Sequence, residues 1–406
     1  MKIKLLILAV VLRLLVSAFI FHPDIKTFNF QSQFLKRGVL NIYTYLETNK
    51  SNLSIKDEFV YFPLTYFTLG GYQAIVSPFL GNEFVTWLNN ADSNAFTLDP
   101  NIFKYLIILK LPYLICDFAI AFLLLKYFDD KKLGKKAFTL WLFNPFTIYY
   151  IYAFGNVDIF PVAITLLSLI LVKSNKLKLA ALSLGIAAGF KLYPLLFVPF
   201  LLLKGKDIKE KFLLGFIPFL TFGLISLPFI SQAFIKSTLI SGLTTRIFNP
   251  GFDVGFGESI IVGLSLFAAL FYAAWLIDKK LNVFKYWLAI LLIIFSFSHF
   301  HIAWLLWIAP LAPFVVILSI KKSYLSYPLF YLAIIVTIIP LLYQDRSMSI
   351  SLYRIYSIWF DLIPTPFTLI QKFFDPYNLQ SILHSLFAGG AGVIVYRVFK
   401  SEKLIR

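Results

Sequence analysis

The sequence predicts an all-α integral membrane protein that crosses the bilayer about twelve times. Of its 406 residues, 59% are hydrophobic and only 14% are charged, whereas soluble proteins average roughly 45–50% apolar and about 25% charged residues. The apolar residues form long blocks, and short basic clusters separate many of these blocks. This pattern excludes a soluble α/β enzyme, a repeat solenoid and a disordered chain, and it lacks the alternating segments of a transmembrane barrel.

The formal net charge of +17 reflects membrane orientation rather than nucleic-acid binding. Of the 37 Lys and Arg residues, 23 fall in clusters beside apolar blocks: Lys2 and Lys4, 126–136, 173–178, 204–211, 279–285, Lys321 and Lys322, and 397–406. Such clusters mark the cytoplasmic face. The sequence therefore predicts a cytoplasmic N-terminus. The single cysteine, Cys116, excludes an internal disulfide.

The apolar blocks predict the spans in order. The first is a retained anchor rather than a cleaved signal peptide, because Arg13 interrupts it and the cleavage pattern is weak. Two later blocks are short for a full crossing, which is typical of broken helices. The predicted spans are 4–21, 103–126, 137–154, 158–173, 177–190, 192–203, 212–230, 258–277, 284–298, 302–320, 324–343 and 380–399.

A large outer loop, residues 22–102, follows the first span. Its apolar stretch 59–80 contains two prolines and two adjacent glycines. A full span there would put residues 81–102, which have no Lys or Arg, in the cytoplasm. We therefore expect a re-entrant or interfacial segment. The chain, residues 1–406, is predicted to be a single transmembrane domain.

Under this topology several polar residues gather on the outer side, where they are candidates for function. They are Asp24, Asn156, Asp158, Lys191, Arg246, His299 and His301. A carboxylate can act as general base on a hydroxyl, and cations can stabilise a departing phosphate. Lys191 could instead snorkel to lipid head groups, and the two histidines could belong to an aromatic belt. Asp117, inside a span, is expected to bond a neighbouring helix.

Five runs resemble the GT-C superfamily of polyprenyl-phosphate-sugar-dependent glycosyltransferases. They are FVYFPLTY (59–66), KLPYLICDFAIAFLLLKYF (110–128), LWLFNPFTIYYIYAFGNVD (140–158), ALSLGIAAGFKLYP (181–194) and SHFHIAWLLWIAPL (298–311). The resemblance covers about 20–310. It is strongest for the first mannosyltransferase of GPI-anchor synthesis and for bacterial polyprenyl-phosphomannose-dependent mannosyltransferases.

The resemblance implies a GT-C-like fold and transfer of a hexose, with mannose favoured, from a polyprenyl-phosphate donor to a glycolipid or glycan acceptor. It implies that Asp24 is catalytic, and that Lys191, Tyr193 and the run from His299 to His301 line the donor phosphate. The run HPDIK carries one acid where the GPI enzyme has two. We therefore expect no bound metal. We also expect inverting chemistry without a cofactor. The charge distribution argues against a nucleic-acid partner, and the Phe-, Ile- and Lys-rich usage favours a prokaryotic cell-membrane enzyme.

Two other classes of membrane protein stay open at this point. A transporter or flippase for a lipid-linked saccharide would also be polytopic and basic inside, although transporters tend to place charges at mid-membrane and to contain inverted repeats. A polymerase that uses a lipid-linked oligosaccharide as donor would share an outer-face site.

Overall fold

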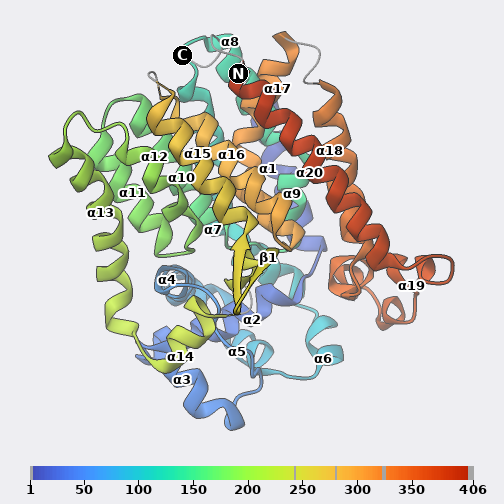
Figure 1. The fold of residues 1–406 in the computed structure, drawn as a ribbon. Helices are drawn as coiled ribbons and strands as arrows, with labels where there is room; N and C mark the ends of the chain where they lie inside the picture. The colour runs from blue at the N-terminus through green and yellow to red at the C-terminus, as the bar shows by residue number, and fades with distance from the viewer. Residues whose placement is uncertain (1–2, 242–243, 279–280, 322–325, 401–406) are drawn as a thin grey trace.

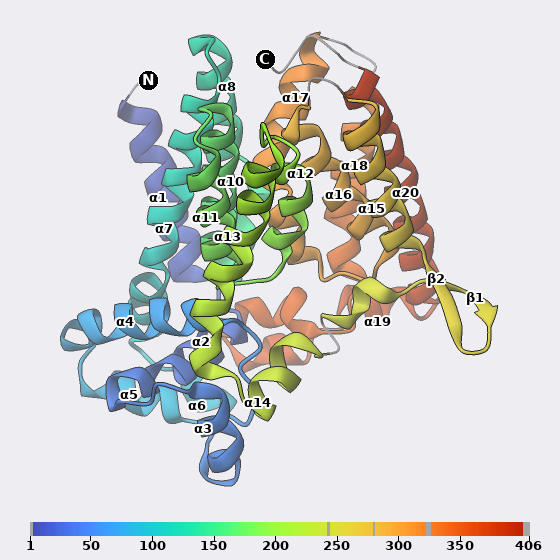
Figure 2. The ribbon, with the colours of Figure 1, turned by 60° about the vertical axis from the view of Figure 1, so that its left-hand side comes forward.

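A computed structural model describes residues 3–241, 244–278, 281–321 and 326–400. The chain is 76% helical, as the composition predicts for an all-α membrane protein. Most helices run roughly side by side in one bundle, and a layer of shorter helices covers one end of it (Figures 1 and 2). We call this layer, formed by residues 22–101, the cap.

The bundle contains long helices and several that are broken into short pieces. Its elements are α1 (Ile3–Phe19), α7 (Ile102–Tyr127), α8 (Lys131–Leu142), α9 (Pro145–Ile148), the π-helix η3 (Tyr149–Ala153), α10 (Ile159–Lys173), α11 (Leu177–Ala188), η4 (Tyr193–Phe197), α12 (Val198–Leu202), α13 (Ile208–Ser226), α15 (Val262–Leu276), α16 (Val283–Phe297), η8 (Ile302–Trp307), η9 (Ala309–Leu311), α17 (Ala312–Lys321), α18 (Ser326–Ile338), η11 (Ile339–Leu342) and α20 (Pro376–Lys400).

The remaining elements are short, except for α4 with 18 residues. The cap contains α2 (Pro23–Ser32), η1 (Gln33–Arg37), α3 (Ile42–Asn49), η2 (Lys50–Asn52), α4 (Pro63–Leu80), α5 (Asn82–Asn89) and α6 (Ser93–Thr97). Two connections add η5 (Leu227–Phe229), α14 (Gln232–Phe234), η6 (Ile235–Leu239), η7 (Thr245–Phe248), β1 (Gly251–Gly255), β2 (Glu258–Ile261), η12 (Arg346–Met348), η13 (Ile350–Tyr353), η14 (Ile358–Asp361) and α19 (Pro366–Ile370).

The two ends of the bundle differ in kind. The start of α1, the turn between α7 and α8, and the end of α20 lie at one end, whereas the cap and α19 lie at the other (Figure 2). The basic cluster Lys126–Lys136 is therefore at the end opposite the cap. In the same view α4, which covers most of the segment 59–80, lies crosswise to the bundle helices.

Helices occur in each predicted span, with one correction. Residues 258–261, predicted as the start of a span, form strand β2, which pairs with β1 in an antiparallel hairpin. The hairpin is exposed along almost its whole length, and α15 begins only at Val262. The run 251–261 contains three glycines, and glycine is unfavourable in a helix interior. Gly255 and Gly257 adopt positive φ angles of 100° and 81°. Glycine adopts such angles without steric cost, and they form the turn between the two strands.

Length and composition alone identify fewer spans than the predicted twelve. Among the described residues, three helical stretches are long and apolar enough to cross a bilayer: Ile102–Tyr127, Ile208–Phe229 and Pro376–Lys400. A bent pair, Ile3–Phe19 with Pro23–Arg37, meets the same criterion together, with a bend of 85°. The other apolar helices have 10–17 residues, so the count of twelve stays a prediction.

A buried polar network joins the first helices of the bundle. The Asp117 carboxylate on α7 accepts hydrogen bonds from Arg13 Nε on α1, from Trp141 Nε1 on α8 at 2.6 Å, and from the Tyr152 hydroxyl on η3 at 2.7 Å. Arg13 and Asp117 are both fully buried. A charge inside a bilayer needs such partners, and the predicted interhelical role of Asp117 is confirmed.

The cap folds around an aromatic core of its own. Tyr43 on α3 packs edge-on against Phe234 of α14 with ring centroids 4.8 Å apart, and Phe62 meets the same ring at 5.8 Å. Offset and edge-to-face contacts of this kind stabilise aromatic clusters beyond the area that they bury. The predicted outer loop is thus a compact layer, and it supports the end of α1 from outside the bundle.

Candidate active site

Asp24 lies in the first turn of α2, directly after α1 ends. Pro23 occupies the first helical position, and His22 caps the helix by accepting a hydrogen bond from the Asp24 backbone N–H on Nδ1 at 3.2 Å. The buried imidazole ring of His22 stacks on Phe154, with centroids 4.3 Å apart. A proline at this position and a capping side chain both favour helix initiation, so the place of Asp24 is fixed by local chemistry.

The Asp24 carboxylate is open, in contrast to the other acids of the site. Its side chain is 56% exposed, and its closest ionisable contact is His22 Nδ1 at 3.7 Å. Within the described ranges, no group donates a hydrogen bond to this carboxylate. Protein still surrounds it at longer range, and the resulting desolvation raises its pKa from 3.8 to about 6. Such a carboxylate can accept a proton near neutral pH.

Four other titratable residues act electrostatically on Asp24. His301 and Lys191 lower its pKa, and the carboxylates of Asp345 and Asp57 raise it. The fold therefore brings Asp24, Lys191 and His301 into one electrostatic neighbourhood, as the sequence predicts.

Lys191 is held by an ion pair with Asp158. Its ammonium nitrogen lies 3.0 and 2.9 Å from the two carboxylate oxygens of Asp158. Asp158 is fully buried and also accepts a hydrogen bond from Trp307 Nε1 at 2.7 Å. Because its oxygens are occupied, Asp158 orients Lys191 rather than offering a carboxylate to a ligand. An ammonium group has three N–H donors, so Lys191, 19% exposed, keeps one for a ligand.

An aromatic cage surrounds the Lys191 ammonium. Tyr61, Trp304 and Trp307 present their rings to it at 5.0, 5.1 and 5.1 Å. Ring faces attract cations at this range. The cage and the ion pair together keep the cation in place when no ligand is bound.

Behind Lys191 the aromatic rings form a stack. Tyr193 and Trp307 are parallel, with centroids 4.4 Å apart, and Trp304 lies on the other side of Trp307 at 5.5 Å. The Tyr193 hydroxyl donates to Thr165 Oγ1 at 3.4 Å, in the bundle interior. Tyr193 therefore supports the site through its ring. The Arg246 guanidinium lies 5.8 Å over Trp304, which connects it to the same stack.

The turn GNVD (155–158) links three parts of the site. Gly155 has a φ of +69°, and a Cβ atom there would lie 2.8 Å from Ile25, next to Asp24. The Asn156 side chain accepts from the Asp158 backbone N–H at 2.9 Å and donates to the Ala303 carbonyl at 3.3 Å. Asn156 thus joins this turn to η8, and only glycine at position 155 lets the turn approach α2 so closely.

His301 faces Asp24 in its neutral form. Its Nδ1 accepts a hydrogen bond from the Ala303 backbone N–H at 3.3 Å, so the ring proton lies on Nε2. Burial lowers its pKa to about 4, although Asp24 opposes this shift. A neutral imidazole with an available N–H is a hydrogen-bond donor at physiological pH.

His299 belongs to the other side of the site. It is exposed. Desolvation lowers its pKa, and Arg246 and His384 lower it further. Lys191 and His301 thus act electrostatically on Asp24, Lys191 and Arg246 both lie over the Trp304 ring, and His299 is influenced by Arg246.

Comparison with known families bears directly on this arrangement. The family model "Glycosyltransferase family 87" matches residues 113–319, just over half of the chain. The chain belongs to glycosyltransferase family 87. No curated protein and no solved structure matches it. The matched region includes Asp158, Lys191 and His301 and excludes Asp24, so family membership shows a glycosyltransferase without assigning its catalytic acid.

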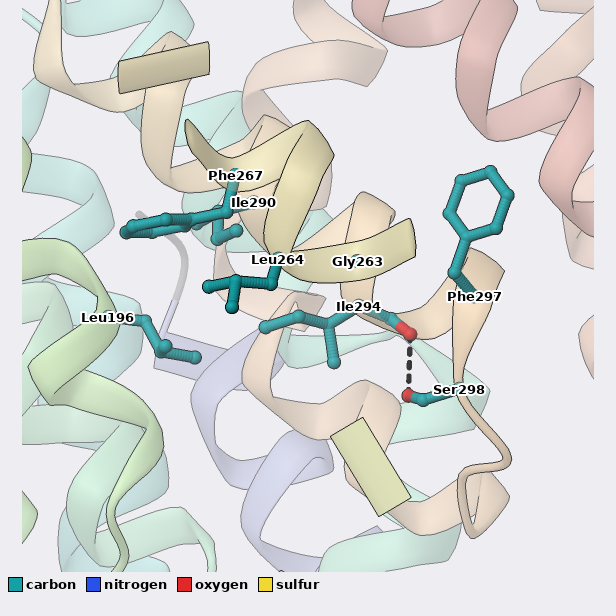
Figure 3. Close-up of a pocket in the computed structure, with 8 residues that line it drawn as sticks. All are labelled: Leu196, Gly263, Leu264, Phe267, Ile290, Ile294, Phe297 and Ser298. Atoms are coloured by element: carbon teal, nitrogen blue, oxygen red, sulfur yellow. Dashed lines mark hydrogen bonds between the residues drawn. The ribbon is translucent and has the colours of Figure 1, made fainter. Parts of the chain in front are cut away.

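The family 87 chain also carries an apolar recess, whose lining residues are drawn in Figure 3. It has an empty volume of about 520 Å³ and is lined by Leu196, Gly263, Leu264, Phe267, Ile290, Ile294, Phe297 and Ser298. Figure 3 shows Leu196, Leu264 and Ile294 converging from three elements. Leu196 lies on η4, the element of Tyr193, and Ser298 directly precedes His299. The recess therefore shares elements with the candidate site, and its lining is suited to a hydrocarbon chain.

Three residues of the glycosyltransferase site were not predicted from the sequence. Tyr61 interacts with Asp158 and packs on Lys191, and His22 caps the helix of Asp24. The third is Asp345. It follows the predicted span 324–343 on the outer side, so its position could have been noticed, but it lies outside the runs that carry the resemblance.

No group of three or more His, Cys, Asp or Glu side chains in the described part of the chain could hold a metal ion.

Proposed function

We propose that this glycosyltransferase transfers a hexose, with mannose favoured by the resemblance, from a polyprenyl-phosphate donor to a hydroxyl of a glycolipid or glycan on the extracytosolic face. One observation carries the proposal: Asp24 is an open carboxylate with a pKa raised to about 6, and it faces Lys191 and His301. A base and a phosphate-binding wall in one site are what such a transfer requires.

The donor phosphate would lie against the cationic wall. Lys191 offers a charged N–H, His301 a neutral one, and Arg246 a planar fork that suits phosphate oxygens. The first isoprene units would occupy the apolar recess lined by Leu264 and Ile294. This placement puts a hydrocarbon chain against apolar side chains and an anion against cations.

The reaction would be a single displacement at the anomeric carbon. Asp24 accepts the proton of the acceptor hydroxyl while the oxygen of that hydroxyl forms a bond to the anomeric carbon. At the same time the bond from the anomeric carbon to the phosphate oxygen breaks. Polyprenyl phosphate leaves with the electron pair, and its developing charge is stabilised by Lys191, His301 and Arg246. One displacement inverts the configuration. No second acid is needed because the phosphate is already a good leaving group, in contrast to the paired carboxylates of glycoside hydrolases.

Replacement of the base tests the proposal. The Asp24→Asn variant keeps the size of the side chain but cannot take up the proton, so we expect transfer to fall by at least about 10²-fold. The measurement is transfer of label from radiolabelled polyprenyl-phosphate hexose by purified protein in detergent. Asp92→Asn is the matched control, since Asp92 is another exposed cap acid whose N-cap role an asparagine preserves.

Near-normal transfer by Asp24→Asn would remove Asp24 from the chemistry. The same labelled donor separates the transferase from a flippase. In detergent a transferase releases free polyprenyl phosphate, whereas in liposomes a flippase moves intact donor across the membrane. Movement without release would overturn the proposed function.

A further inference from the structure

The segment that follows α18 packs against the turn that carries Asp24. The Leu352 carbonyl of η13 accepts a hydrogen bond from the Phe21 backbone N–H at 3.1 Å. The Tyr356 hydroxyl donates to the Phe19 carbonyl at 2.9 Å. The C-terminal connection 343–375 therefore forms one side of the site, although it lies beyond the residues that match family 87.

Asp345 is placed at the start of this connection. Its neighbour Tyr343 donates a hydrogen bond to the Phe300 carbonyl at 3.1 Å, and the Tyr343 ring lies 5.6 Å from that of His301. Asp345 itself caps η12, with its Oδ1 accepting from the Ser347 backbone N–H at 2.8 Å. Its side chain is exposed. Within the described ranges no other group bonds to its carboxylate, so the cap fixes the side chain and leaves acceptor capacity open.

Four groups from three segments act electrostatically on one another here. The Asp345 carboxylate interacts electrostatically with Asp24, with His22 and with His301. Both histidines are neutral, because burial lowers the pKa of His22 to about 3 and that of His301 to about 4. The site thus has an anionic side with Asp24 and Asp345, and a cationic side with Lys191 and Arg246.

We propose that Asp345 binds the acceptor, its carboxylate accepting hydrogen bonds from sugar hydroxyls next to the one that Asp24 deprotonates. The proposal rests on the proposed function. The donor phosphate is an anion and is repelled from this side, whereas an uncharged polyol is not. A carboxylate has two oxygens and can accept from two neighbouring hydroxyls, and hydrogen bonds to a charged group are stronger than neutral ones.

The first test measures Michaelis constants of the Asp345→Asn variant. Asparagine caps a helix as well as aspartate does, so the variant keeps the fold of η12 and loses the charge. With alkyl mannosides and alkyl glucosides as acceptor probes, we expect the acceptor KM to rise about 10-fold or more. The donor KM should stay within about twofold, because the phosphate lies on the opposite side.

Asp375→Asn is the matched control. Asp375 has the same local geometry, its Oδ1 accepting from the Tyr377 backbone N–H at 2.9 Å, and it lies in the same connection. This variant should leave both Michaelis constants unchanged. A change common to both variants would show loss of a cap rather than loss of acceptor binding.

The pH dependence of the transfer rate gives a second test, because it would not change in Asp345→Asn if Asp345 had a purely structural role. Transfer needs ionised Asp24, so its rate falls below the pKa of that carboxyl. Removing the Asp345 charge favours ionised Asp24, and the acid limb of the profile should therefore shift to lower pH. Asp57, His22, His301, Lys191, Tyr61 and Tyr113 also act on Asp24, and they are unchanged in the variant.

An unchanged acceptor KM in Asp345→Asn, with wild-type protein active, would overturn the inference and leave the proposed function standing. Failure of the wild-type protein to release polyprenyl phosphate would overturn the proposed function, and this inference with it. An Asp345→Asn variant that raises the donor KM instead would contradict the placement of the acceptor on this side.

Discussion

At the scale of the residue, partners decide what each aspartate can do. Asp117 accepts from Arg13, Trp141 and Tyr152, and Asp158 accepts from Lys191 and Trp307, so both carboxylates are occupied. A buried carboxylate requires such partners. Among the described residues no group donates a hydrogen bond to the Asp24 carboxylate, and its pKa is raised. The open carboxylate is therefore the one that can exchange a proton with a ligand.

The open carboxylate should cost the fold stability at neutral pH. Its pKa is about 6 in the folded protein against the ordinary value of 3.8 for an aspartate. Between these values the native state binds more protons than the unfolded state, so stability falls as pH rises through this window. We expect Asp24→Asn to have a higher Tm than wild type at pH 7.5, and the difference to vanish near pH 4.

Thermal unfolding of both proteins in detergent from pH 4 to pH 7.5 measures this difference. A difference that does not change with pH would show that the two Tm values differ for another reason than the charge of Asp24. A variant less stable than wild type at neutral pH would contradict the prediction that ionised Asp24 destabilises the fold.

At the scale of the element, the site depends on how the first helices of the bundle are joined. The Asp117 network connects α1, α7, α8 and η3. The first of these leads into Asp24, and the last leads into the turn with Gly155 and Asp158. Lys110, on α7, donates to the Ser17 and Ile20 carbonyls at 3.1 and 2.9 Å, and so caps the end of α1. The positions of the turn that carries Asp24 and of Asp158, the partner of Lys191, are thereby set from the same helices.

A double-mutant cycle on Arg13 and Asp117 tests this arrangement. Each single change to leucine leaves an unpaired charge in a dry interior, and we expect each to cost about 3–5 kcal/mol of stability. The double variant should be destabilised by less than the sum of the two, because neither charge remains. The measurement is equilibrium or thermal unfolding in detergent. Additive losses would show that the two side chains do not interact in the folded protein.

At the scale of the whole molecule, a basic cluster and the candidate site lie at opposite ends of the bundle. The basic cluster between α7 and α8 lies at one end, and the cap with Asp24 lies at the other (Figure 2). The positive-inside rule predicts that the first end is cytoplasmic. Under this prediction the candidate site opens on the extracytosolic side, as the proposed function requires.

Cysteine labelling tests this orientation. In a Cys116→Ser background, cysteines at Ser51, in the cap, and at Lys132, in the α7–α8 turn, replace two exposed side chains. We expect a membrane-impermeant maleimide to label position 51 in intact cells and position 132 only after the membrane is opened. Labelling of both positions from one side would refute the topology, and labelling of position 132 alone would reverse it.

The sequence by itself determined the class of the protein and much of its helix layout. A bilayer demands long apolar segments and tolerates few charges inside, so hydropathy and basic clusters place helices without knowledge of their contacts. For the same reason the candidate residues could be assigned to one side. It also assigned the interhelical role of Asp117, since a charge inside a span needs a partner.

Only the tertiary structure decided which of these residues is free and which is occupied. Asp158 is bound by Trp307, 149 residues later in the chain, and Asn156 by Ala303, 147 residues later. Asp345 acts electrostatically on Asp24 from more than 300 residues later in the chain. Such contacts depend on how helices pack, which local composition does not encode. The hairpin 251–261 and the folded cap escaped prediction similarly, because glycine turns and aromatic clusters gain their stability from neighbours distant in the chain.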